Sequence, residues 1–110
     1  MDSWELGELV GRRSAMARPY LEFIRTASLS AGLYVLAAGA IDHQQPHTED
    51  ELYYVVSGRG QVTVAHETEP VASGSVIFVG ATVPHRFHDI EEELRIVVFF
   101  APPEGSAANS

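Results

Sequence analysis

Residues 39–58 read GAIDHQQPHTEDELYYVVSG. Residues 42–51 of this stretch are almost all polar and include two of the five histidines of the chain, and the residues that follow are mostly apolar. Side chains at alternate positions share one face of a β-strand. On this pattern Gln45, His47 and Glu51 project to one side, and Tyr53 continues that face. We therefore expect a strand that brings potential metal ligands to the edge of a hydrophobic interior.

A second histidine cluster lies at residues 84–89, which read PHRFHD. By the same alternation His85 and Phe87 share a face with the aspartate that ends the cluster, whereas Arg86 and His88 point outward. Imidazole and carboxylate groups are ligands of divalent transition metals. Together the two clusters predict a site built from both stretches.

Short apolar runs separated by Gly, Pro, Ser, Asp and Glu follow one another from residue 18 onward, a pattern typical of an all-β sandwich or barrel. We expect strands near 19–25, 31–37, 51–56, 61–65, 75–79, 85–88 and 94–100, with turns at 57–60, 73–75 and 89–93. Residues 1–17 are expected to form an N-terminal arm with a short helical turn near 4–10, and residues 18–101 one barrel. The tail, 102–110, is small, polar and Pro-containing, so we expect it to be disordered.

Composition excludes several classes of protein. The chain has 110 residues and no cysteine, so disulfides, thiolate metal sites and cysteine nucleophiles are ruled out. Its formal net charge of −8 leaves no basic stripe for nucleic acid or for an anionic membrane. No apolar run approaches the roughly 18–20 residues of a spanning helix. With no secretory signal recognisable at the N-terminus, we expect a cytoplasmic location.

The two histidine stretches resemble the paired motifs of the cupins. The first cupin motif is matched at its expected spacing by Gly39, Gln45, His47, Glu51 and Gly58. The second motif falls on residues 74–89, where Gly74 and His85 match it. Gly80, Thr82 and Asp89 occupy the places in which that motif usually has Pro, Gly and Asn. The resemblance covers about fifty residues and implies a cupin fold, a double-stranded β-helix or jelly-roll barrel. It also implies that His47, Glu51 and His85 bind a metal ion.

The chain departs from the cupin pattern at one position of the expected metal site. Gln45 stands where the first motif usually has a histidine, and its amide oxygen can coordinate a hard divalent ion or hold a water molecule. His43, two residues away on the same predicted face, is an alternative fourth ligand, and water is another. A set of two imidazoles and one carboxylate with amide support favours Fe²⁺ or Mn²⁺, while Ni²⁺ or Zn²⁺ also suits imidazole.

Three functions are compatible with these residues. The first is a metal-dependent enzyme, a dioxygenase, isomerase or lyase, acting on a small oxygen-rich molecule that chelates the ion. In such an enzyme the candidate catalytic groups are Glu51 and Tyr53. The candidate substrate contacts are Tyr53, Phe87 and His43. The second is a barrel that binds a small molecule without turnover. The third is a metal-free enzyme with His47, His85 or Glu51 as general base.

Two predicted strands are apolar on both faces, at residues 76–79 and 96–100. One face of each fits the barrel interior, and the other needs a separate cover. A second copy of the chain would provide it. We therefore expect a homodimer whose only other partner is a small-molecule ligand or substrate.

Overall fold

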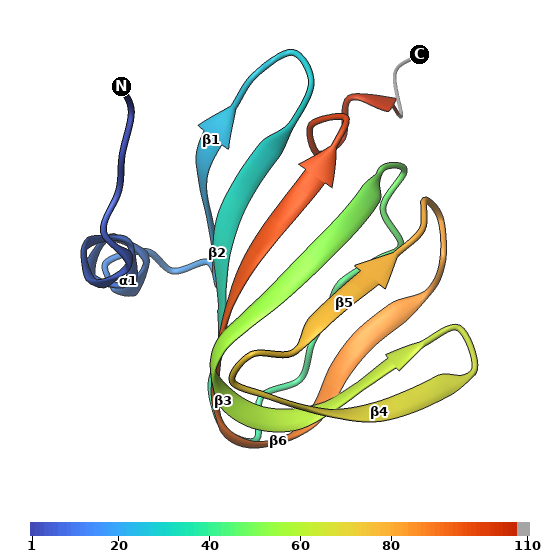
Figure 1. Cartoon of the computed structure of the whole chain (residues 1–110). Helices are drawn as coiled ribbons and strands as arrows, with labels where there is room; N and C mark the ends of the chain where they lie inside the picture. Colours follow the sequence, from blue (N-terminus) through green and yellow to red (C-terminus); the bar gives the residue numbers. More distant parts are fainter. Residues whose placement is uncertain (108–110) are drawn as a thin grey trace.

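The computed structural model describes residues 1–107, and most of their regular structure is antiparallel β-sheet. The elements are α1 (Leu6–Ser14), β1 (Tyr20–Arg25), β2 (Ser30–Leu36), β3 (Asp50–Val64), β4 (Glu67–Ala72), β5 (Val76–Val79) and β6 (His85–Ala101). The sheet order is β1-β2-β6-β3-β4, and β5 pairs with β3. Figure 1 shows that β3 and β6 are long and strongly curved, so the sheet wraps around an interior. The predicted all-β barrel class is confirmed.

The stretches at residues 57–60 and 89–93, expected to be turns, lie inside β3 and β6 instead. Each long strand therefore joins two of the predicted strands. The β3–β6 register shifts three times between Val55 and Gln61, which bends the pair. At Gly58 (φ +99°) an added Cβ would lie 2.1 Å from the Glu93 carbonyl oxygen. Glycine is therefore needed at position 58 because two strands approach closely there, and not because the chain makes a hairpin turn.

Alternation along β3 follows the predicted faces. Glu51, Tyr53 and Val55 are buried, while Leu52 and Tyr54 between them are exposed. The interior side chains form one apolar core inside the curved sheet. The side of β3 that carries Glu51 and Tyr53 is thus the inner one.

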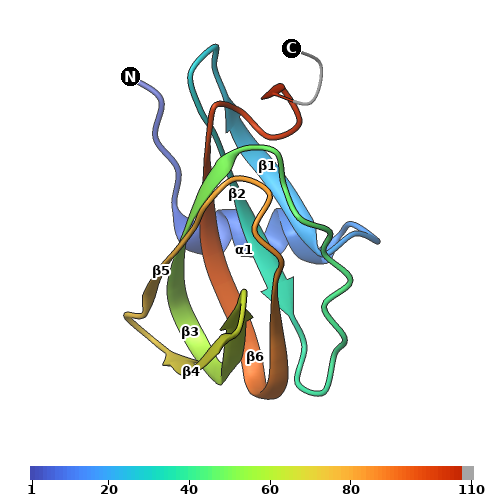
Figure 2. The same ribbon diagram turned by 90° about the vertical axis from the view of Figure 1, so that its right-hand side faces the viewer.

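The N-terminal arm folds into α1, a longer helix than the short turn expected. Its Leu9 packs with Leu21, Leu33 and Val35 against the β1–β2 hairpin, in a second cluster outside the barrel core. Figure 2 shows α1 lying across these strands. Within residues 1–107 there is no helix of the length and apolar character needed to cross a bilayer.

The expectation of a disordered tail is wrong for residues 102–107, which fold back onto the barrel. Pro103 is buried, and the backbone N–H of Glu104 donates to Ser30 Oγ at 2.9 Å. The backbone N–H groups of Gly105 and Ala107 donate to the buried carboxylate of Glu49. These acceptors are distant in sequence, so local composition could not reveal them. The remaining residues of the predicted tail, 108–110, lie outside the described part of the chain.

Candidate metal centre

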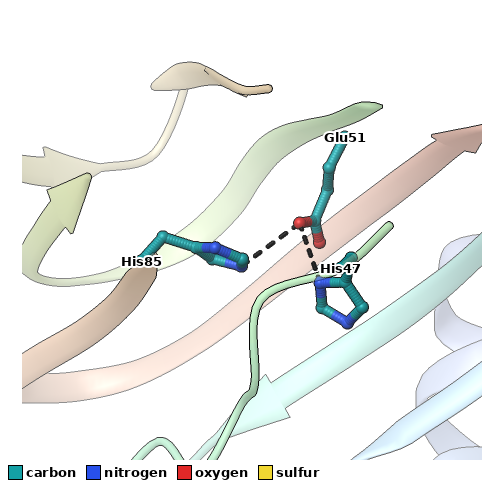
Figure 3. A group of neighbouring side chains, drawn as sticks. All are labelled: His47, Glu51 and His85. Carbon is teal, nitrogen blue, oxygen red and sulfur yellow. Dashed lines mark ion pairs between the residues drawn. The ribbon is translucent and has the colours of Figure 1, made fainter. Parts of the chain in front are cut away.

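Three side chains from separate elements converge at one end of the barrel. His47 lies in the loop before β3, Glu51 near the start of β3, and His85 at the start of β6. Figure 3 shows both imidazole rings turned toward the Glu51 carboxylate. Glu51 Oε1 lies 3.2 Å from His47 Nδ1 and 3.2 Å from His85 Nε2. One ligand atom from each residue lies within 4.8 Å of the others, so the three could hold one metal ion.

The converging atoms lack the partners that buried polar atoms normally have. His47 Nδ1, His85 Nε2 and both carboxylate oxygens of Glu51 are buried without a hydrogen bond to any described residue. Although the closest contacts are 3.2 Å, they do not have hydrogen-bond geometry. Each buried polar group left unsatisfied costs about 1–3 kcal/mol. A divalent cation would satisfy all four atoms at once, so the donor set fits a metal.

The ring of His85 is held in a form suited to binding. Its Nδ1 lies 2.9 Å from the carbonyl oxygen of Val83, to which it donates a hydrogen bond. In a neutral imidazole only one nitrogen carries the proton. In the neutral form that binds a metal, Nε2 would therefore carry the lone pair, and this nitrogen lies beside Glu51.

The charges of the cluster are strongly coupled. Burial of Glu51 would raise its pKa, but contacts with His47, His85 and Tyr53 outweigh burial and lower it to about 2. Burial of His47 would lower its pKa, but Glu104 and Glu51 raise it to about 9. For His85, Glu51 and the Val83 carbonyl likewise outweigh burial and raise the pKa. Glu51 is therefore an anion near neutral pH, and protons compete with a metal for the histidines.

The loop at residues 40–47 changes the predicted position of Gln45. This loop contains no strand, so alternation does not apply to it. Gln45 is exposed and does not line the cavity beside the cluster, which corrects its expected inward orientation. Gln44 points inward instead, and its amide oxygen accepts a hydrogen bond from the Tyr53 hydroxyl at 3.0 Å. The amide nearest the site is thus already occupied by a protein donor.

The inward position of Gln44 depends on Asp42, a buried residue that the sequence pattern did not single out. Asp42 accepts hydrogen bonds from the Tyr34 hydroxyl at 2.6 Å and from Gln44 Nε2 at 2.8 Å. It also accepts the backbone N–H of Phe87 at 2.9 Å. Asp42 thereby ties the loop to β2 and β6 and orients the residues beside the cluster.

The predicted substrate contacts divide into two groups. Tyr53 and Phe87 are fully buried, their ring centroids lie 5.0 Å apart, and neither lines the cavity. They belong to the packing beneath the cluster, because both sit on inner faces of the central strands. His43, an exposed residue, does line the cavity.

A cavity of about 380 Å³ opens beside the cluster. Its lining combines His47 and Glu51 with polar and apolar side chains of the loops, β1, β2 and β6: Arg18, Pro19, Tyr20, Tyr34, Leu36, Ile41, His43, Gln44, Val98, Phe100 and Glu104. The Tyr20 hydroxyl is buried and has no hydrogen-bond partner in the described chain. Sequence reasoning missed Arg18, Tyr20 and Glu104, because each lies far along the chain from the two motifs.

Comparisons with known proteins agree with this architecture. The sequence model of the family described as "Cupin domain" matches residues 32–100. An uncharacterized protein of Streptomyces coelicolor is 51% identical over 104 residues, covering 94% of this chain and 99% of that protein.

Solved structures resemble the chain at lower sequence identity. Ectoine synthase from P. lautus has a TM-score of 0.76 at 21% identity, covering 94% of this chain and 79% of that one. DMSP lyase DddQ from Ruegeria pomeroyi has a TM-score of 0.67 at 16% identity, covering 76% of this chain and 47% of that one. At these identities the likeness establishes a shared jelly-roll fold.

Proposed function

The chain belongs to the cupin family. We propose that it is a metal-dependent enzyme acting on a small, oxygen-rich, chelating molecule. One observation carries the proposal. Four buried ligand atoms of His47, Glu51 and His85 converge without hydrogen-bond partners, beside a cavity of about 380 Å³. A cavity of this size suits a small molecule. A dioxygenase, an isomerase or a lyase fits this arrangement, and structural neighbours include a lyase and ectoine synthase.

The ion we favour is Fe²⁺ or Mn²⁺, with Ni²⁺ or Zn²⁺ as further occupants. Two imidazoles and one carboxylate form the ligand set typical of non-haem iron sites with open positions. Because Gln45 is exposed, the preference for a hard ion rests on Glu51, and the open positions are left to water or substrate. Such an ion would supply Lewis acidity or redox chemistry with O₂.

The residues around the cavity would bind and orient the substrate. The unpartnered hydroxyl of Tyr20 can donate to a substrate oxygen, a role that buried Tyr53 does not fill. Leu36, Val98 and Phe100 give the cavity an apolar wall that excludes water. Glu51, with its pKa lowered to about 2, is a weak base, so the metal-free general-base alternative loses one of its three candidates.

The test combines metal analysis with turnover. Untagged protein purified without added metal is expected to contain close to one equivalent of a divalent ion, and a His47→Ala/His85→Ala variant none. Oxygen uptake and substrate loss are then measured with hydroxy acids, enediols and catechols. Metal-free wild type would overturn the proposal. Metal binding with ligand stabilisation, but no turnover, would instead indicate a non-catalytic binding protein.

Metal affinity should depend on pH. His47, with its pKa raised to about 9, carries a proton at pH 7 that a metal must displace. Well below pH 9 the affinity for Zn²⁺ is therefore expected to rise about tenfold per pH unit, with release of about one proton from His47 per ion, and the rise should level off as pH 9 is approached. Chelator competition at pH 6.5, 7.5 and 8.5 measures this slope. A His43→Ala variant should keep it, and an affinity independent of pH would contradict the assignment.

We also propose that the outer face of β3, β5 and β6 binds a second copy of the chain. Phe78 lies opposite Leu52, and Leu52 opposite Phe99, so three exposed apolar side chains form a row across the sheet. Val76 and Tyr54 extend the patch. These five residues are uncharged, so two chains of net charge −8 could meet here without like charges in the contact.

A charge placed in this patch should separate the dimer. Phe78 is 63% exposed in the single chain, so Phe78→Glu should leave the fold of the monomer intact. Light scattering after gel filtration is expected to give twice the chain mass for wild type and for Phe78→Leu, and the chain mass for Phe78→Glu. A monomeric wild type at micromolar concentration would rule out this dimer.

A further inference from the structure

The segment formed by residues 102–107, here called the strap, returns over the end of the barrel that holds the metal cluster. Its backbone is fixed at several points. Arg25 Nη2 donates to the carbonyl of Glu104 at 2.9 Å, and Ser30 Oγ accepts the N–H of the same residue. Figure 1 shows the strap folding back beyond the end of β6, near the loop between β1 and β2. The position of Glu104 is thus determined by the fold.

Glu49 is the main anchor of the strap. The residue is 2% exposed, and its carboxylate accepts hydrogen bonds from Gly105 N at 2.8 Å and Ala107 N at 3.0 Å. Thr48 Oγ1 also donates to it. Both oxygens of Glu49 are therefore engaged by the protein. This buried acid lies two residues from a metal-ligand candidate, yet it holds the strap and is not free for an ion.

The strap delivers the Glu104 carboxylate to the outer nitrogen of His47. Glu104 Oε2 lies at an ion-pair distance of 3.3 Å from His47 Nε2, on the side of the ring opposite the Nδ1 that faces Glu51. A carboxylate at Nε2 stabilises a proton there. When His47 binds a metal, Nδ1 is then the nitrogen with a free lone pair. In His85 the nitrogen that faces away from Glu51 also has a partner, because Nδ1 donates a hydrogen bond to the Val83 carbonyl.

We propose that Glu104 is a positioning residue that orients the His47 ring and selects the tautomer whose Nδ1 faces the metal. A metal-binding histidine normally donates its other N–H to a carboxylate or carbonyl, and loss of that partner costs about 10–100-fold in metal affinity. This role rests on the proposed metal site. It adds to that site a strap, anchored on Glu49, whose Glu104 orients one of the three ligands, His47.

The test compares Glu104→Leu, which removes the acceptor, with Glu104→Gln, which retains an acceptor oxygen. Zn²⁺ affinity by chelator competition is expected to fall at least about tenfold in Glu104→Leu and less in Glu104→Gln. Glu67→Leu, which removes an exposed acid of β4, should bind as wild type. Equal affinity in wild type and Glu104→Leu would overturn the proposal.

A second readout separates positioning from simple stability. In ¹⁵N-histidine spectra of the metal-free protein, the His47 Nε2 proton should exchange slowly in wild type and Glu104→Gln and rapidly in Glu104→Leu. The Zn²⁺-loaded wild type should show this proton on Nε2 and the metal on Nδ1. If wild type binds no Zn²⁺, the proposed function fails, while the metal-free spectra still test the contact between Glu104 and His47. Rapid exchange in wild type would refute that contact.

Discussion

Replacing Glu51 with glutamine is expected to remove metal binding at physiological metal concentrations. Loss of a residue that is hydrogen-bonded to a metal ligand lowers metal affinity about 10–100-fold. Loss of the anionic ligand itself should therefore lower the affinity by more than about 100-fold. The amide is neutral, and it cannot match the charge that the carboxylate presents to both histidines. Chelator competition with Zn²⁺ or Mn²⁺ measures the change, and turnover of any substrate found should fall with it.

The neighbouring residue on β3 provides the control. Asp50 is exposed on the opposite face of the strand, where it accepts the backbone N–H of Ala81. Asp50→Asn should therefore keep the metal affinity of wild type. If Glu51→Gln abolished turnover while metal content stayed at the wild-type level, Glu51 would act as a base and not as a ligand.

Replacing Gly58 with alanine is expected to destabilise the protein severely. The new Cβ would lie 2.1 Å from the Glu93 carbonyl oxygen and 2.7 Å from Leu94 Cα, both of them backbone atoms of β6. The positive φ of +99° adds backbone strain. Strain alone costs about 1–3 kcal/mol, so with the clash we expect a loss of about 3 kcal/mol or more in the free energy of unfolding.

The same substitution at Gly74 separates the cost of backbone strain from the cost of the steric clash. Its φ is +94°, close to that of Gly58, but an added Cβ there would meet nothing within 4 Å. Gly74→Ala should therefore cost only about 1 kcal/mol. Urea unfolding of both variants measures the difference. Equal losses would show that β3 and β6 can move apart at Gly58 without penalty.

The stretch around Gly58 shows where prediction from the sequence failed. A local pattern such as Ser57-Gly58-Arg59-Gly60 predicts a turn, because glycine permits positive φ. In the structure Gly58, with its positive φ, lies where the register of the antiparallel β3–β6 pair shifts. The approach of a strand more than thirty residues away decides between these uses, and no local pattern contains it.

Residues 40–47 show the same limit at the metal centre. Alternation predicts side-chain direction only where a strand ladder holds the backbone. It was therefore correct for Tyr53 on β3 and wrong for Gln45 in the loop. In the loop, Asp42 determines that Gln44 turns inward.

The sequence by itself determined the all-β class, the family and the three residues that the structure brings together, His47, Glu51 and His85. These follow from hydrophobic patterning and from spacing within short motifs, which are local properties. Only the tertiary structure decided that Gln44 and Tyr20 flank the site, and that the strap carries Glu104 to His47. Those contacts join segments that are distant in sequence. They depend on how the barrel closes, because a carboxylate 57 residues away reaches an imidazole only when strands and strap are packed in place.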